Sequence, residues 1–190
     1  MRVMVLWAIG LLALSGSAAA EPPAHAEGGF AVEAPPGFRE ACGRYAWLCR
    51  ADPGHTQQLS DARLLGIATR VNARVNRAIM QVDDSVNHGA AEYWALPRNG
   101  RGDCEDIALL KMKLLLEEGV LSKDLVMAIV LDRRGDNHAV LLLRLESGDV
   151  MLDSLTETIA LWHRSGYRVL ARQAIANKSQ WEALLPAAGQ

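Results

Sequence analysis

Two stretches of the chain have the hydrophobic spacing of helices. Over residues 60–81, apolar side chains recur every three or four positions, which predicts an amphipathic helix with Ser60 as its N-cap. A second helix is predicted from about residue 103 to 118, ending at Gly119. Because residues 107–116 are apolar nearly all round, we expect this helix to be central and covered on most sides.

Runs of branched and aliphatic residues follow, and they predict strands over residues 125–131, 138–145 and 150–155. A further strand is predicted over residues 167–175, and Trp181 is expected to close the core. Helices followed by a strand meander are typical of an α+β fold.

Two other segments lack regular spacing. Residues 82–102 form a long loop by this criterion, and long loops in compact domains are often functional. Residues 21–37 hold four of the seven prolines, which predicts an extended, poorly ordered leader. The remaining residues, 38–190, are expected to form a single domain.

The first twenty residues have the pattern of a secretory signal peptide. Arg2 precedes an apolar run over residues 3–14, and Ala18 and Ala20 supply an A-x-A cleavage pattern. The run is shorter than the ~20 residues of a membrane span, so we expect cleavage before Glu21 and no stable membrane insertion. The mature protein is then expected to be periplasmic or secreted.

Composition narrows the function classes. The chain has 50% hydrophobic residues and a formal net charge of −2, which excludes a disordered chain. Cleavage would remove one Arg and no acid, leaving 19 basic and 22 acidic residues, a net charge of −3. Without a basic surplus, no nucleic-acid partner is expected.

The three cysteines are expected to have different roles. In an oxidising compartment, the simplest interpretation of Cys42 and Cys49 is a local disulfide. The alternative is a pair of packed, reduced thiols, while a redox-active pair would need C-x-x-C spacing. Cys104 is then the unpaired thiol.

Cys104 lies at a predicted helix start, with Asp103 as the cap and Asp106 three positions further on. The positive end of the helix dipole favours a thiolate there. Asp103, Glu105 and Asp106 oppose it, unless a divalent cation such as calcium neutralises them. The alternatives are a small buried Cys and acids that merely favour a helix N-terminus.

A nucleophilic Cys needs a base and an orienting group. His138 opens an apolar strand, and Asp153 interrupts another, where an unpaired acid would be costly to bury. A hairpin turn at residues 147–148 would place Asp153 opposite Leu142, about 13 Å along the strand from His138. Direct contact would then need strand twist, a bulge or a different register. His88, in the loop before Cys104, is the alternative base.

Four short motifs resemble the bacterial transglutaminase-like cysteine peptidases. They are Glu-Tyr-Trp-Ala-Leu-Pro at residues 92–97, Gly-Arg-Gly-Asp-Cys-Glu-Asp at 100–106, Asn-His-Ala-Val at 137–140 and Val-Met-Leu-Asp at 150–153. The resemblance covers residues 38–181. It implies a papain-like, transglutaminase-like α+β fold, in which a central helix carrying the Cys packs on an antiparallel sheet.

The resemblance also implies a catalytic triad of Cys104, His138 and Asp153, with Asp103 and Glu105 as calcium ligands. One branch of this family is a periplasmic, calcium-dependent protease that releases a surface adhesin and so controls biofilm attachment. It implies a protein substrate, such as an adhesin, and an inner-membrane regulatory receptor. This chain resembles a shorter branch, and it has Ser154 where the family usually has Asn.

The sequence thus predicts an exported cysteine endopeptidase. Two alternatives stay open at this stage. One is a protein-crosslinking acyltransferase that uses the same triad with an amine acceptor, and the other is a non-catalytic binding module on the same fold.

Overall fold

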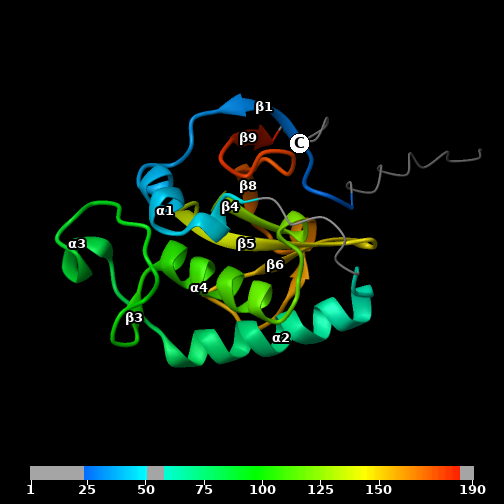
Figure 1. Ribbon diagram of the computed structural model, residues 1–190, viewed down its shortest axis with the longest axis horizontal. Helices are drawn as coiled ribbons and strands as arrows, with labels where there is room; N and C mark the ends of the chain where they lie inside the picture. Colours follow the sequence, from blue (N-terminus) through cyan, green and yellow to red (C-terminus); the bar gives the residue numbers. More distant parts are fainter. Residues whose placement is uncertain (1–23, 51–57, 185–190) are drawn as a thin grey trace, which may run out of the picture.

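The computed structural model describes residues 24–50 and 58–184. The signal peptide expected over residues 1–20 lies outside these ranges. Within them, no helix is both long enough and apolar enough to cross a membrane. The described chain builds a seven-stranded antiparallel sheet with its helices packed around it (Figure 1).

The sheet has the strand order β1-β9-β8-β4-β5-β6-β7. The strands are β1 (Gly28–Val32), β4 (Leu125–Leu131), β5 (Asn137–Leu145), β6 (Gly148–Leu152), β7 (Ala160–Leu161), β8 (Arg168–Gln173) and β9 (Trp181–Leu184). The central strands β4 and β5 are buried over most of their length, as their apolar runs predict. The predicted strands are therefore confirmed, with ends that differ by up to three residues.

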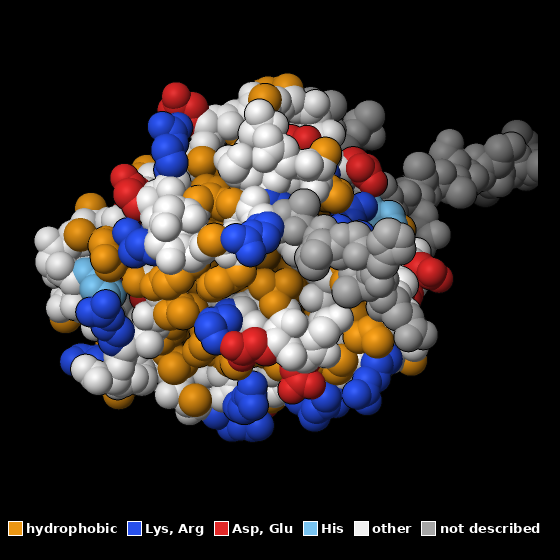
Figure 2. Space-filling view, in the orientation of Figure 1, with side chains coloured by type: hydrophobic (Ala, Val, Ile, Leu, Met, Phe, Trp, Pro, Cys, Tyr) orange, Lys and Arg blue, Asp and Glu red, His pale blue; other side chains and the backbone are white. Residues whose placement is uncertain are grey.

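Two long helices lie on one face of the sheet. Helix α4 (Cys104–Glu117) packs against β5, and α2 (Asp61–Ala78) packs against α4 (Figure 1). The apolar side of α2 is buried, and exposed Arg side chains lie along its outer side (Figure 2). The shorter elements are α1 (Phe38–Arg44), η1 (Ala46–Leu48), β2 (Met80–Gln81), α3 (Asp84–Asn87), β3 (Arg101–Gly102), η2 (Ser122–Asp124) and η3 (Trp162–Arg164). The predicted α+β fold, with a central helix on an antiparallel sheet, is confirmed.

The prediction of a poorly ordered leader over residues 21–37 is wrong for its described part. Strand β1 pairs with β9 at the edge of the sheet, and Ala26 is completely buried. Asp149 accepts hydrogen bonds from the Ala26 N–H at 2.9 Å and from His25 Nδ1 at 2.8 Å. Strand pairing is made by backbone hydrogen bonds and needs little from side chains. The composition of this segment, with a proline pair on each side of the strand, therefore did not predict β1.

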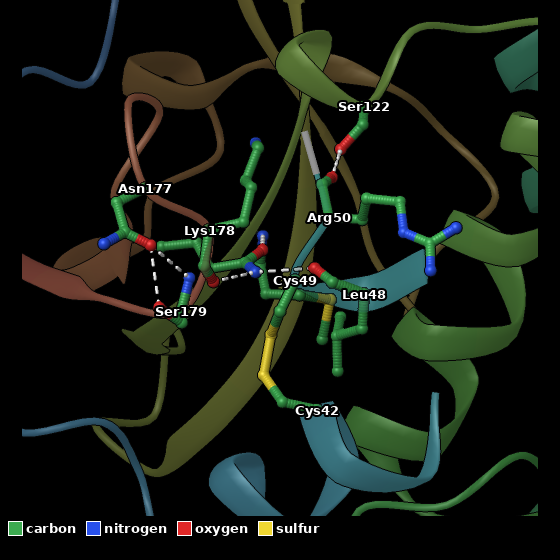
Figure 3. Close-up of a disulfide and its surroundings, with 10 residues drawn as sticks. Cys42, Leu48, Cys49, Arg50, Ser122, Asn177, Lys178 and Ser179 are labelled. Carbon is green, nitrogen blue, oxygen red and sulfur yellow. Dashed lines mark hydrogen bonds between the residues drawn. A yellow bond between two sulfur atoms is a disulfide. The ribbon is translucent and has the colours of Figure 1, made fainter. Parts of the chain in front are cut away.

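The predicted disulfide is present. Cys42 in α1 is joined to Cys49, one residue after η1, with their Cα atoms 5.6 Å apart (Figure 3). Gln173 in β8 donates hydrogen bonds to the Leu48 and Lys178 carbonyls, at 3.0 and 2.7 Å. The bridged segment is thereby tied to the sheet.

Three aromatic side chains join the first helix to the rest of the core. Phe38 meets Trp94 and Trp181 edge to face, with ring centroids 5.5 and 5.1 Å apart. All three side chains are buried, which confirms the prediction for Trp181. Gly37 adopts φ +80°, and a Cβ there would lie 2.9 Å from Trp94 Cδ1. This close approach holds residues 33–37 against residues 92–94.

Candidate active site

Cys104 is the first residue of α4, the helix start that the sequence predicts. The Asp103 carboxylate caps the helix by accepting a hydrogen bond from the Asp106 N–H, at 3.5 Å. Cys104 Sγ is only partly buried; it lies 3.4 Å from the Ala139 nitrogen on β5 and 3.2 Å from Glu105 Oε2. The packing of α4 on β5 therefore brings the sulfur beside the residue that follows His138.

His138 and Asp153 are in direct contact. His138 Nε2 lies 2.7 Å from Asp153 Oδ1, and both side chains are almost fully buried. The β5–β6 register pairs Leu142 with Met151, so Asp153 comes two residues closer to His138 than the predicted hairpin placed it. A different register, one of the three options left open by the sequence, closes the gap.

Asp153 accepts two further hydrogen bonds. Tyr167 Oη donates to Oδ2 at 2.7 Å, and the Leu155 N–H donates to Oδ1 at 3.0 Å. Burial by itself would raise the pKa of Asp153, but the bonds from His138, Leu155 and Tyr167 outweigh it and lower the pKa. Asp153 is thus a stable carboxylate that fixes the imidazole through Nε2 and leaves Nδ1 free of this contact.

The loop after Asp153 is held by amide side chains of α2. Asn76 Nδ2 donates to the carbonyls of Asp153 and Thr156, both at 2.9 Å. Asn72, a polar residue of α2, is completely buried and donates to the Thr156 carbonyl at 3.1 Å. Within the described residues, the Ser154 hydroxyl is buried without a hydrogen-bond partner.

A group of carboxylates lies on the other side of Cys104. Ligand atoms of Asp84, Asp103 and Glu105 all lie within 4.8 Å of one another, and Asp84 Oδ1 is buried without a hydrogen-bond partner in the described chain. Burial and the charge of Asp103 raise the pKa of Glu105 to about 9. Burial and the charge of Asp84 raise the pKa of Asp103 to about 6. Crowded oxygen ligands of this kind fit a calcium ion.

The thiol itself is held protonated in this environment. Burial raises the pKa of Cys104, and the negative charge of Glu105 raises it further. The helix start favours the thiolate, but burial and the carboxylates outweigh it. Positive charge placed beside Glu105 would favour the thiolate.

His88, the alternative base, points elsewhere. Its Nε2 lies 4.0 Å from Asp84 Oδ1 and 3.9 Å from Asp106 Oδ2. It does not belong to the residues that line the cleft beside Cys104, whereas His138 does. The structure thus brings Cys104, His138 and Asp153 together and places His88 behind the acidic group.

The cleft beside Cys104 has a volume of about 410 Å³. Cys104, Glu105 and residues 137–139 line one part of it. Residues 33–36 together with Glu92 and Trp94 line another. Trp94 is a buried core residue, and it also contributes to the lining of the cleft. An extended peptide could lie here with its carbonyl against the sulfur.

Three residues at this site were missed from the sequence. Asp84 follows another acid in a loop without periodicity, and Tyr167 stands in a predicted strand without any mark of function. Lys111 is completely buried in α4, and burial lowers its pKa to about 7, against the opposing charge of Asp153. Of these three residues, only Lys111 could have been noticed in the sequence, because it is a Lys inside an apolar helix segment.

Comparisons with known proteins agree with the fold. *Legionella pneumophila* LapG matches with a TM-score of 0.54 and 22% identity over 77% of this chain and 86% of that one. A calcium-bound structure of the same protein matches with a TM-score of 0.53 and 23% identity, over 67% of this chain and 74% of that one. No curated protein sequence matches this chain.

A family model gives the assignment. The model for bacterial transglutaminase-like cysteine proteinases matches residues 29–188, most of the chain. This range includes the helix that carries Cys104 and every strand of the sheet, apart from Gly28 at the start of β1. The chain therefore belongs to the bacterial transglutaminase-like cysteine proteinase family, and it is a cysteine peptidase that acts on protein substrates.

Proposed function

We propose that this protein is an exported cysteine endopeptidase with Cys104 as nucleophile, His138 as base and Asp153 as the orienting acid. The observation that carries the proposal is the 2.7 Å contact between His138 Nε2 and Asp153, next to a sulfur 3.4 Å from the Ala139 nitrogen. The three side chains come from α4, β5 and the residue after β6. Cys104 and His138 line the same cleft, and Asp153 contacts His138 from outside its lining.

In this mechanism, His138 Nδ1 takes the proton from the Cys104 thiol, and the sulfur attacks the peptide carbonyl carbon. The Cys104 N–H, at the first position of α4, has no acceptor within the helix and donates to the developing oxyanion. Collapse of this intermediate breaks the C–N bond, and the imidazolium protonates the amine that leaves. Water, deprotonated by His138, then cleaves the thioester and restores the thiol.

Calcium dependence is part of the proposal. Asp84, Asp103 and Glu105 would hold the ion, as their buried oxygens and the unpartnered Asp84 Oδ1 support. The ion would supply positive charge beside Cys104 and so favour the thiolate. Structures of *L. pneumophila* LapG described as calcium-bound and EGTA-treated are in keeping with a family that binds this metal.

The location and substrate rest on the sequence. The signal-peptide pattern of residues 1–20 supports export to the periplasm. By resemblance to the adhesin-releasing branch, the substrate would be a surface adhesin or another periplasmic protein. An inner-membrane receptor would regulate access to it.

The test is cleavage of proteins in a periplasmic fraction by the purified protein, with new N-termini mapped by mass spectrometry. Cys104→Ala should abolish every cleavage, while its circular dichroism spectrum and unfolding midpoint stay unchanged. Cleavage that survives in the Cys104→Ala variant would overturn the proposal. An added primary amine should leave the products unaltered. Amine-modified products would instead assign the chain as an acyltransferase.

A further inference from the structure

The cleft beside Cys104 carries carboxylates and lacks basic partners for them. Glu33, Glu92 and Glu105 line it, together with the imidazole of His138. No Lys or Arg is found among the described residues that line it. Glu105 belongs to the proposed calcium group, which would compensate its charge. The charges of Glu33 and Glu92 lie outside that group.

These two glutamates stand on a fixed wall, made of residues 33–37 and 92–94. Gly37 lies against the Trp94 ring, and Phe38 packs edge to face on the same ring. Glu33 directly follows β1, whose last residue pairs with Trp181 in the sheet. Glu92 Oε2 accepts a hydrogen bond from Trp94 Nε1 at 3.3 Å. Packing of the aromatic core thus positions both carboxylates at the cleft.

Neither carboxylate is neutralised within the described chain. Among the described residues, 24–50 and 58–184, no ion pair within 4.0 Å involves Glu33 or Glu92. Arg39, the basic residue nearest to Glu33 in the sequence, lines a neighbouring groove instead of this cleft. Arg44 is engaged by the Trp94 carbonyl at 2.7 Å and by the face of Tyr93, 4.3 Å from the ring centroid.

Most of the remaining lining is apolar. Besides Cys104, Trp94 and the polar Asn137, it consists of Ala34, Pro35, Pro36, Ile129, Ala139 and Ala171. Lys and Arg side chains have long apolar stems that pack on such surfaces while the charged end reaches a polar group. An apolar cleft with carboxylates on its wall therefore matches both parts of a basic side chain.

We propose that Glu33 and Glu92 make this enzyme select substrates with a Lys or Arg side chain close to the scissile bond. The proposal rests on the proposed peptidase function and names the substrate class for that same cleft. Exposed ion pairs contribute modestly, so each glutamate is expected to account for up to about fivefold in selectivity. The effect should weaken as salt concentration rises, because these charges face solvent.

Charge-matched thiol reagents test the cleft without requiring peptidase turnover. Cys104 is the only cysteine outside the Cys42–Cys49 disulfide, so labelling by 2-aminoethyl and 2-sulfonatoethyl methanethiosulfonate reports on this sulfur alone. Rates are measured by intact mass at fixed ionic strength with calcium present, and are divided by the rates for free cysteine. The ratio of cationic to anionic labelling should exceed one.

Glu33→Gln and Glu92→Gln should each lower that ratio by up to about fivefold, and the double variant by more. The control is Glu146→Gln, an exposed glutamate in the β5–β6 turn, which should leave the ratio unchanged. A ratio of one in the native protein, or a ratio that neither cleft variant changes, would overturn the proposal.

Peptide cleavage separates this proposal from the peptidase assignment. Peptides built on a mapped cleavage site would carry Lys, norleucine or Glu at each flanking position in turn. Faster cleavage of a Lys peptide, lost in the double variant, supports the proposal. Cleavage without any preference for Lys overturns the substrate class alone. If no peptide or protein is cleaved, the peptidase function fails, whatever the labelling ratio.

Discussion

The two sides of Cys104 are built in opposite ways. On the paired side, His138, Asp153 and Tyr167 satisfy one another through hydrogen bonds of 2.7 Å. On the acidic side, Asp84, Asp103 and Glu105 crowd their oxygens together, and Asp84 Oδ1 has no hydrogen-bond partner in the described chain. The paired side is organised by the protein alone, whereas the balance of charge on the acidic side is what we propose a calcium ion would supply.

The largest effect is expected on the paired side. Asp153→Asn should lower kcat by about 10³-fold or more, because the amide cannot stabilise the imidazolium or fix the same tautomer. The measurement is steady-state cleavage of a mapped peptide. The hydrogen-bonded shape is kept, so the unfolding midpoint should change little. A loss below tenfold would mean that Asp153 does not orient the base.

Removal of the cation should come next in size. A chelator, or Asp84→Asn, should lower kcat/KM by about 100-fold, since the carboxylates beside Cys104 would then oppose the thiolate. Added calcium should restore the chelated native protein but not the variant. Calcium binding can be followed independently by calorimetry. Full activity in the presence of a chelator would contradict the proposed role of the metal. It would not affect the roles proposed for the residues of the paired side.

Tyr167→Phe tests how far the paired side extends. Loss of the hydroxyl bond to Asp153 Oδ2 should lower kcat by about tenfold, the scale of a hydrogen bond to a charged group. That bond lowers the pKa of Asp153, so its loss should move the acid limb of the pH–rate profile to higher pH. An unshifted limb together with unchanged kcat would limit the role of Tyr167 to packing.

Lys111 Nζ is buried near the paired side without a hydrogen-bond partner in the described chain, and it should affect stability more than activity. Its pKa is lowered to about 7 when folded, so between about pH 7 and its unfolded value of about 10.5 the unfolded chain binds more protons. The free energy of unfolding should therefore rise with pH over this window. Lys111→Met should stabilise the fold at pH 7 by about 1–4 kcal/mol and flatten this rise, as measured by urea unfolding. An unchanged slope would mean that Lys111 stays charged in the folded state.

The features that could be predicted from the sequence are those that depend on residues close together in the chain. Local signals were sufficient for the helix cap at Asp103, the disulfide and the strands of the meander. The motif resemblance pointed to Cys104, His138 and Asp153, and the structure places them together, although the roles of these three side chains stay a prediction. The sheet register was wrong by two residues, because nothing local chooses between turns one or two residues apart.

Contacts between distant segments could not be predicted. Asp84 joins the acidic side from α3, and Tyr167 reaches Asp153 from the position just before β8. Neither partner is marked by spacing or composition. The edge strand β1 was missed for a related reason, because its pairing with β9 depends on a segment about 150 residues away in the sequence.

The most direct test is the pH dependence of Cys104 alkylation by iodoacetamide, measured by intact mass with calcium and with a chelator. The account predicts that calcium moves the midpoint of alkylation to lower pH, and that His138→Ala raises it again. Identical midpoints with calcium and with chelator, unaffected by His138→Ala, would contradict it.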